Sequence, residues 1–291
     1  MVISVTSVYD RFPERLQHAA QRWYYVVDPR FSWSSRKKME EVNEQFVDRF
    51  FEDEAEFKAY EREFFEGRIV DVCQRATKAV PEDVAIYDAH REACVKLYAL
   101  IRKRRPETLV ETGVYNGVST LSMLLALERN DTGTLHSIDY STHLDRSAAA
   151  DQRAREFYER GRPSCAEPRS TTLPAGKEPG WIIPDDLHER WELRLGRSQR
   201  TLVEILPSLG TVDLYLHDSE HSTSCMLFEF ELAWEWLTAG GLLVSSHVDR
   251  NDAFETFVKE RGCEHGLLDY VYDLRYDEYT EPCSSGYVVK S

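Results

Sequence analysis

Short apolar runs alternate with amphipathic segments over residues 81–140 and again over residues 191–291. The runs predict buried strands, and the segments with apolar residues three or four positions apart predict helices between them. Strands that alternate with helices favour a mostly parallel sheet covered by helices on both faces. The five strands predicted in this part are Thr108–Glu111, Leu135–Ile138, Trp191–Leu195, Val212–Leu216 and Leu242–Ser245. The helices predicted around them are Ile86–Ile101, Val118–Leu127, Thr201–Leu206 ended by Pro207, Cys225–Leu237 ended by Gly240 and Gly241, and Ala253–Glu260 ended by Gly262.

The C-terminal part adds two apolar runs without a long helix between them, Leu268–Tyr272 and Tyr287–Val289. We expect them to form an antiparallel hairpin at one edge of the sheet, which makes seven strands in all. Residues 141–190 are irregular and rich in glycine and proline, and they read as an insertion. The sequence thus predicts one α/β domain over residues 81–291.

Residues 1–80 differ from the rest because they are helical in pattern, aromatic and acidic. Phenylalanines and a tyrosine recur at spacings of three, four or seven, which places them on one face of a helix or helix pair. We interpret this part as a helical cap packed on the main domain, with a homodimer contact or a substrate lid as the alternatives. The residues of this face are Phe46, Phe50, Phe57, Tyr60 and Phe64.

The composition narrows the class of protein. Acidic residues outnumber basic ones by 51 to 36, and the resulting net charge of −15 repels phosphate backbones, which argues against a nucleic-acid binder. No apolar run approaches the ~20 residues needed to cross a bilayer, and no signal peptide is evident, so we expect a cytoplasmic protein without membrane contact. The six cysteines form no C-x-x-C pair, so reduced thiols are expected.

The turn after the first predicted strand carries two glycines four positions apart, Gly113 and Gly117. They allow the backbone to turn sharply and to approach a ligand closely, and the helix that follows begins with open N–H groups and a positive dipole end. The turn matches neither the three-glycine dinucleotide fingerprint nor a P-loop. Asp139 ends the second strand, where a carboxylate can accept hydrogen bonds from both hydroxyls of a ribose. Together these features predict an adenosine-type ligand.

The fourth and fifth strands run into the most polar segments of the chain. Asp218, Glu220 and His221 follow the fourth strand, and His247 and Asp249 follow the fifth. Because adjacent strand ends lie about 5 Å apart, we expect these side chains to converge. Such a group offers acids, bases and metal ligands together.

These motifs carry a resemblance to a known family. The glycine turn resembles motif I of class I S-adenosylmethionine (AdoMet) methyltransferases. The segments GWIIPDDLHERWELRLG, VDLYLHDSEHS, FEFELAW and GGLLVSSHVDRNDAF are similar in order and spacing to the macrocin O-methyltransferase-like group over residues 85 to 291. The resemblance implies a Rossmann-like class I methyltransferase sheet, AdoMet as cofactor, and O-methylation of a hydroxyl on a small molecule or sugar. The implied cofactor-binding residues are Glu111, Gly113, Tyr115, Asn116, Gly117, Ser119, Asp139, Ser198 and Asp218.

The resemblance also implies catalytic and metal-binding roles. The implied catalytic residues are His247, Glu220 and His221, and the implied metal ligands are Asp218 and His247. In the group, an acid pair after the fifth strand commonly helps to hold Mg²⁺, but here Ser246 and His247 occupy those positions. Because Mg²⁺ prefers oxygen ligands, a metal that tolerates imidazole and a metal-free His247 base both stay open.

Three other functions are weighed against this one. A nicotinamide-dependent oxidoreductase would share the sheet, but the third glycine of its dinucleotide fingerprint is missing from this sequence. A metal-dependent hydrolase could use His217, Asp218, His221 and His247. A non-catalytic AdoMet-binding protein would explain the missing acid pair. The expected partners are a hydroxylated small molecule and a second copy of the chain through its N-terminal helices, without nucleic acid or membrane.

Overall fold

The computed structural model describes residues 33–80, 91–140, 173–174, 176–272 and 282–291, and it contains a seven-stranded sheet. The strand order is β3-β2-β1-β4-β5-β7-β6. Strands β3 to β5 pair in parallel, whereas β7 pairs antiparallel to both β5 and β6. This confirms the predicted Rossmann-like class I methyltransferase sheet with its antiparallel hairpin at one edge. The strands are β1 (Thr108–Thr112), β2 (Thr134–Asp139), β3 (Trp191–Leu195), β4 (Val212–His217), β5 (Leu237–Ser245), β6 (Glu264–Tyr272) and β7 (Pro282–Val289).

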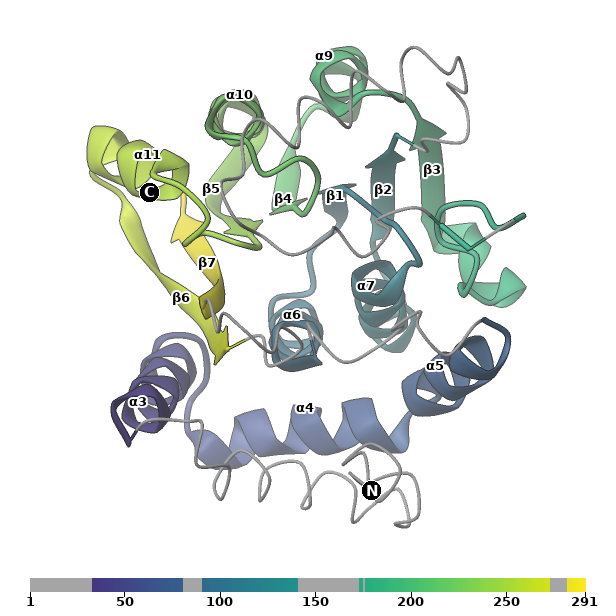
Figure 1. The fold of residues 1–291 in the computed structure, drawn as a ribbon, viewed down its shortest axis with the longest axis horizontal. Helices are drawn as coiled ribbons and strands as arrows, with labels where there is room; N and C mark the ends of the chain where they lie inside the picture. Colours follow the sequence, from purple (N-terminus) through teal and green to yellow (C-terminus); the bar gives the residue numbers. More distant parts are fainter. Residues whose placement is uncertain (1–32, 81–90, 141–172, 175, 273–281) are drawn as a thin grey trace, which may run out of the picture.

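Helices cover both faces of the sheet (Figure 1). One face carries α6 (Arg91–Arg104) and α7 (Val118–Asn130), and the other carries α9 (Ser198–Leu209), α10 (Thr223–Trp236) and α11 (Ala253–Arg261). Beneath α6 and α7 lies an outer layer of α3 (Trp33–Phe50), α4 (Glu54–Glu66) and α5 (Ile69–Lys78). A short 3-10 helix, η1 (Asp185–Arg190), leads into β3. The protein therefore has two apolar cores, one on each face of the sheet, and each lies between the strands and the helices that cover that face.

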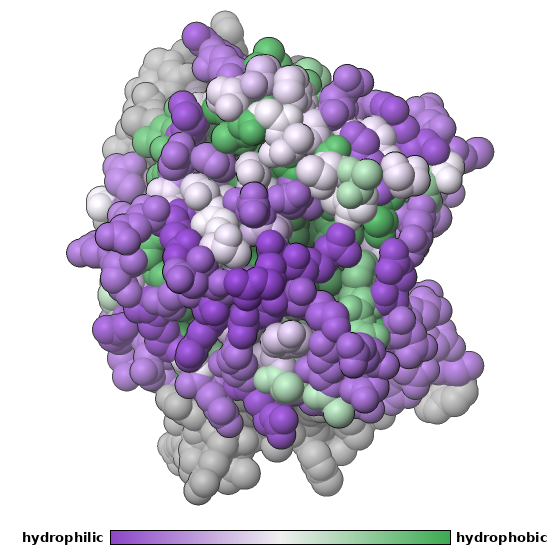
Figure 2. Space-filling model, turned by 180° about the vertical axis from the view of Figure 1, so that it is seen from behind, coloured by the Kyte–Doolittle hydropathy of each residue, from purple (hydrophilic) through white to green (hydrophobic). Residues whose placement is uncertain are grey.

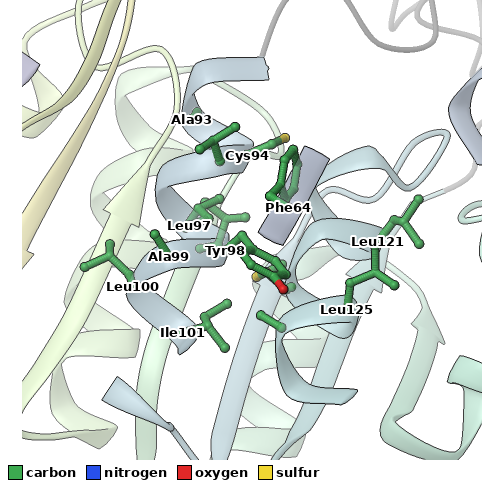
Figure 3. Close-up of a cluster of buried hydrophobic side chains, with 14 of the residues drawn as sticks. Phe64, Ala93, Cys94, Leu97, Tyr98, Ala99, Leu100, Ile101, Leu121 and Leu125 are labelled. Carbon is green, nitrogen blue, oxygen red and sulfur yellow. The ribbon is translucent and has the colours of Figure 1, made fainter. Parts of the chain in front are cut away.

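The outer layer is tied to the sheet by buried aromatic rings and one buried cation. Phe46 and Phe64 are almost completely inaccessible and belong to the same core as α6 and α7, part of which is drawn in Figure 3. Lys96 of α6 is fully buried, and its Nζ donates 2.6 Å to the carbonyl of Leu268 and also to the side chain of Asn43. Since Asn43 is on α3 and Leu268 is on β6, this lysine joins an outer helix to the sheet. The dimer contact through these helices stays a prediction.

Two predicted boundaries are wrong for identifiable reasons. Pro207 does not end its helix, because α9 continues to Leu209 and the N–H of Gly210 closes the last turn on the carbonyl of Leu206. Gly240 and Gly241 do not separate a helix from a strand either, since β5 runs through both of them. Their N–H and carbonyl groups bond to Lys290 near the C-terminus, and this long-range pairing has no local sequence signal.

The surface opposite to the view of Figure 1 is mainly hydrophilic, with apolar residues in smaller patches (Figure 2). None of the helices in the described part of the chain is long and apolar enough to span a bilayer. Among the described cysteines, Cys73, Cys94, Cys225 and Cys263 are all free thiols.

Candidate functional site

The loop between β1 and α7 has an unusual backbone. Gly113, Tyr115 and Gly117 all have positive φ angles, of 89°, 50° and 98°. A Cβ added to Gly113 would lie 2.1 Å from the carbonyl oxygen of Asp218, so the loop and the end of β4 approach more closely than any side chain allows. The glycine spacing therefore serves two needs, a left-handed turn and a close contact between neighbouring strand ends.

Asp139 holds this loop from the end of β2. Its Oδ2 accepts hydrogen bonds from the backbone N–H groups of Val114 (2.7 Å) and Tyr115 (2.8 Å). Both hydrogen bonds end on the same carboxylate oxygen, Oδ2. The carboxylate thus stands against the glycine loop at the carboxyl edge of the sheet, where it was predicted to meet a ribose.

Glu111 anchors the start of α7 from within the sheet. Its carboxylate is fully buried and accepts hydrogen bonds from the hydroxyls of Ser119 and Thr120, each at 2.7 Å, and of Ser137 at 2.9 Å. Burial raises the pKa of Glu111 to about 7, although the three hydroxyls oppose the shift. Glu111 therefore fixes the start of the helix through Ser119 and Thr120.

The start of α7 lacks a capping side chain. Its N-cap residue is Gly117, which has no side chain to accept a hydrogen bond from the N–H groups of the first turn. The N–H groups of that turn and the helix dipole favour an anion such as a carboxylate. This end of α7 is therefore suited to an anionic group.

The segment before η1 packs against the same loop. Gly180 donates its N–H to the carbonyl of Tyr115 at 2.8 Å, and Trp181 Nε1 donates to Asn116 Oδ1 at 2.7 Å. Lys177 lies 4.4 Å above the Trp181 ring. Asn116 is buried and thus ties the loop to the inserted segment, whereas Tyr115 is 37% exposed.

The ends of β4 and β5 bring three predicted residues together. Ligand atoms of Asp218, His221 and His247 all lie within 4.8 Å of one another, and the three side chains are half-buried. His221 Nε2 is 4.0 Å from Asp218 Oδ1, and the rings of His221 and His247 have centroids 4.4 Å apart. Ser246 donates a hydrogen bond from its hydroxyl to Asp218 Oδ1. We call Asp218, His221 and His247 the Asp-His-His cluster.

Other predicted residues lie outside this cluster. Glu220 is half-buried and is not a member. Asp249 is turned toward β7, where its Oδ2 accepts the N–H of Ser284 at 3.0 Å, and burial raises its pKa. The expectation that all the acids and histidines at these strand ends converge is therefore wrong for Asp249. Ser198 is buried at the start of α9 and its hydroxyl helps to lower the pKa of Glu229.

Glu229 of α10 is the main polar residue that the sequence reading missed. It is fully buried, and its Oε2 is 2.6 Å from His217 Nδ1. Burial by itself would raise the pKa of Glu229, but the hydrogen bond and charge of His217, followed by serine and threonine hydroxyls, lower it to about 2. Further donors to its two oxygens are Thr112 (2.6 Å), Tyr215 (2.8 Å) and Ser219 (2.8 Å). An acid within the apolar FEFELAW helix was the available signal.

His217 connects this buried acid to the cluster. While its Nδ1 faces Glu229, its Nε2 is 3.3 Å from Nδ1 of His221. Both ring nitrogens are thus engaged inside the protein. A hydrolase site that uses His217 as a fourth metal ligand or as a base is not favoured by this arrangement.

A small cavity lies between the cluster and α6. Its volume of about 20 Å³ has room for about one water molecule. The lining includes Cys94, Ser119, Asp218 and Ser246. Burial raises the pKa of the Cys94 thiol to about 12, so this cysteine is an apolar wall and not a nucleophile.

One family model matches part of the chain. Residues 110–246 match a model described as a methyltransferase domain. The match covers just under half of the 291 residues and runs from β1 to Ser246, so it includes the glycine loop, Asp139 and Asp218 and stops beside His247. The domain agrees with the class I methyltransferase predicted from the motifs, while the macrocin-like group stays a prediction.

Solved structures with a similar fold include several methyltransferases. An O-methyltransferase from Bacillus cereus in complex with SAH is 14% identical, with a TM-score of 0.49 over 86% of this chain and 97% of its own. The O-methyltransferase TomG from Streptomyces achromogenes, involved in tomaymycin synthesis and solved with SAM, is 17% identical, with a TM-score of 0.43 over 77% of this chain and 89% of its own. The SAH-bound Podospora anserina methyltransferase PaMTH1 is 15% identical, with a TM-score of 0.44 over 77% of this chain and 87% of its own.

All three identities are below 20% and all three TM-scores are below 0.5. The comparison with curated proteins found no match. The similarity to a methyltransferase domain comes from the family model, and the fold is established by the strand order of this chain.

Proposed function

We propose that this protein is an AdoMet-dependent O-methyltransferase that acts on a hydroxylated small molecule. The single observation that carries the proposal is that two features lie next to each other at one edge of the sheet. The glycine loop held by Asp139 lies next to the end of β4, and the Asp-His-His cluster begins at that same strand end. A nucleoside cofactor at the loop would thus lie next to an acceptor hydroxyl at the cluster, and the matched residues 110–246 include the loop, Asp218 and His221.

The residues present suit AdoMet. The uncapped start of α7 offers N–H groups to its carboxylate, and Asp139 offers a carboxylate to its ribose hydroxyls. Only glycine fits at Gly113 and Gly117, where an added Cβ would meet the backbone of Asp218 or of Gly180. When bound, AdoMet supplies a methyl group on a positively charged sulfur.

The Asp-His-His cluster supplies what an oxygen acceptor needs. The acceptor O–H must lose its proton while its oxygen forms a bond to the methyl carbon, and the carbon–sulfur bond breaks to leave the neutral thioether. Asp218 and the two imidazoles can orient the acceptor oxygen, and Glu220, His221 and His247 are the groups that can receive the proton. Fixed alignment of the acceptor oxygen with the methyl group contributes several kcal/mol by proximity.

The proposal is tested by methyl transfer from AdoMet that carries a labelled methyl group. The full chain is incubated with a panel of phenols, catechols and sugars, and the label is followed into an O-methyl product by mass spectrometry. We expect a product whose label is removed by strong ether-cleaving acid, as an O-methyl group is. Label that appears only on nitrogen, sulfur or carbon acceptors contradicts O-methylation, and AdoMet binding without any transfer supports a non-catalytic AdoMet-binding protein.

A further inference from the structure

Two of the three possible metal ligands in the Asp-His-His cluster are imidazole nitrogens, whereas Mg²⁺ prefers oxygen ligands. We propose that Asp218, His221 and His247 bind a divalent transition metal through two imidazole nitrogens and one carboxylate oxygen. This inference deepens the proposed function, on which its purpose in the reaction rests, and it replaces the magnesium site that the family resemblance implies. The metal class is Zn²⁺, Co²⁺ or Fe²⁺.

The ligand atoms of the cluster are slightly farther apart than those of a filled metal site. With metal–ligand bonds of about 2.0–2.2 Å, neighbouring ligands of one ion lie roughly 2.8–3.6 Å apart. The ligand atoms of the cluster lie within 4.8 Å of one another, and His221 Nε2 is 4.0 Å from Asp218 Oδ1. Small side-chain rotations therefore bring all three into one coordination sphere.

The donor set decides between metals. Mg²⁺ prefers an octahedron of oxygens, whereas imidazole suits zinc, cobalt and iron, and a pair of histidines with one carboxylate is a common iron or zinc arrangement. Ser246 does not replace a missing acid, because its hydroxyl donates to Asp218 Oδ1 and so fixes this carboxylate. A hard cation would find one charged oxygen ligand where the related sites offer three.

An outer layer of hydrogen bonds orients His221. His217 Nδ1 lies 2.6 Å from the Glu229 carboxylate, and in the tautomer that donates this N–H the lone pair of the ring is on Nε2. Nε2 of His217 is 3.3 Å from Nδ1 of His221, and in the same tautomer it accepts the N–H of His221. Nε2 of His221, the atom that faces Asp218, then carries a lone pair. Metal-binding histidines are held by carboxylates and other acceptors in this way.

The backbone at His247 is held in a conformation that a metal ligand can justify. Its φ of 53° lies in the left-handed region, which costs free energy in residues other than glycine. Hydrogen bonds on both sides maintain it, from Ser246 N to the carbonyl of His217 (3.0 Å) and from Val248 N to the carbonyl of Ser284 (3.0 Å). The strain places the His247 ring beside that of His221.

The metal site also divides the catalytic roles. If His221 and His247 hold the metal, neither is available to take the acceptor proton. Of the three predicted catalytic residues, Glu220, which lies outside the cluster, is then the one that remains for this role. The metal, when bound, supplies a Lewis acid that lowers the pKa of the acceptor hydroxyl.

The test measures metal binding without any substrate. The full chain is stripped of metal with a chelator and titrated by calorimetry with Co²⁺ alone and with Mg²⁺ alone, and the visible spectrum of the Co²⁺ sample is recorded. Two variants alter the cluster, His221→Gln and His247→Asn. Asparagine tolerates the left-handed backbone, so the second variant exchanges a nitrogen for an amide oxygen without added strain. The matched control is His265→Gln, which removes an exposed imidazole on β6.

We expect one Co²⁺ per chain, bound at least ~100-fold more tightly than Mg²⁺, and a visible spectrum of nitrogen and oxygen ligands without thiolate bands. Both cluster variants should lose about 10-fold or more in Co²⁺ affinity, and His265→Gln should lose none. Equal or tighter binding of Mg²⁺ overturns the proposal, and so does Co²⁺ affinity that both cluster variants retain.

The wild-type selectivity alone decides the question if a variant does not fold. AdoMet titration of the same samples keeps the two proposals apart. Absent AdoMet binding with intact Co²⁺ selectivity contradicts the proposed function and not the metal site. Intact AdoMet binding without Co²⁺ selectivity contradicts the metal site and not the proposed function.

Discussion

Nε2 of the buried His217 lies 3.3 Å from Nδ1 of His221, so the core of the protein and the Asp-His-His cluster share a hydrogen bond. On its other side His217 is bonded to Glu229, whose carboxylate is inaccessible to solvent. A buried carboxylate on α10 is thereby linked through His217 to the ring of His221. Since one imidazole nitrogen must be unprotonated to bind a metal or a proton, this chain of contacts connects the fold to the chemistry.

Replacement of Glu229 by glutamine should therefore be felt at the cluster. The variant removes the charge that fixes His217, and we expect Co²⁺ affinity to fall by about 10–100-fold while AdoMet affinity changes little. Calorimetric titration with each ligand measures both quantities. Tyr215→Phe is the matched control, because it removes one donor to the same Glu229 oxygen and leaves His217 in place. Equal Co²⁺ affinities in Glu229→Gln and the wild type would separate the buried network from the site.

Glu111 should make the stability of the fold depend on pH. Its pKa is about 7 in the folded protein and 4.5 when solvated, so the protonated carboxyl is favoured by folding. This contribution to stability is complete below about pH 4.5 and is lost as the pH rises through 7, and it is on the order of 3 kcal/mol. Glu111→Gln, which is neutral at every pH, should remove this loss.

Urea unfolding at pH 5.5 and pH 8.5 measures the effect. The difference in the free energy of unfolding between the two pH values should be smaller in Glu111→Gln than in the wild type. Glu107→Gln is the control, because it changes an exposed carboxyl just before the same strand. If Glu111→Gln has the same pH dependence as the wild type and the control, Glu111 does not titrate in this range.

Gly117 is expected to be irreplaceable for steric as well as backbone reasons. Gly117 has a φ of 98°, and a Cβ added to it would lie 2.9 Å from Gly180 Cα and 3.2 Å from Ile183 Cδ1. Gly117→Ala should reduce the free energy of unfolding by roughly 1–3 kcal/mol and also weaken AdoMet binding. Gly210→Ala is the control, since its φ is 79° and its added Cβ would meet nothing within 4 Å.

Thermal unfolding and AdoMet titration of the two variants distinguish strain from contact. We expect Gly210→Ala to lose stability only, with unchanged AdoMet affinity. Unchanged AdoMet affinity in Gly117→Ala would show that the loop can shift its contact with Gly180 without consequence for the cofactor.

The outer helices should unfold together with the sheet. Phe46 of α3 is fully buried and lies against the rings of Phe50, Phe51 and Phe57. Phe46→Ala should cost about 3–5 kcal/mol, whereas Phe228→Ala, at a ring that is 39% exposed, should cost much less. Circular dichroism and tryptophan fluorescence should follow one transition. Separate transitions in Phe46→Ala would mean that α3–α5 form an independent unit.

Much of the sheet could be predicted because its strands are short apolar runs bounded by glycine, aspartate and proline. The predicted and observed bounds of β3 are identical, those of β1 and β4 differ by one residue at one end, and those of β2 differ by one residue at each end. Local chemistry fixes such elements. The start of β5 at Leu237 was missed because Gly240 and Gly241 are held by the C-terminal Lys290, a partner about fifty residues away.

The site was predictable as a set of strand ends and not as a set of contacts. Asp139 and the glycines were found because motif spacing dictates their place at one edge. The direction of Asp249 could not be found, since it depends on its bond to β7. Glu229 was missed because an acid in an apolar helix is identified as buried only when its partners on β1 and β4 are known.

The most direct test of the central claim is calorimetric titration of the wild-type chain and of Asp139→Ala with AdoMet, with NAD⁺ as the competing nucleotide and Asp185→Ala as an exposed-acid control. We predict that the wild type and Asp185→Ala bind AdoMet alike and do not bind NAD⁺, and that Asp139→Ala binds AdoMet at least ~10-fold more weakly because a charged ribose contact is lost. Wild-type protein that takes up NAD⁺ in place of AdoMet, or Asp139→Ala with undiminished AdoMet affinity, would contradict the account.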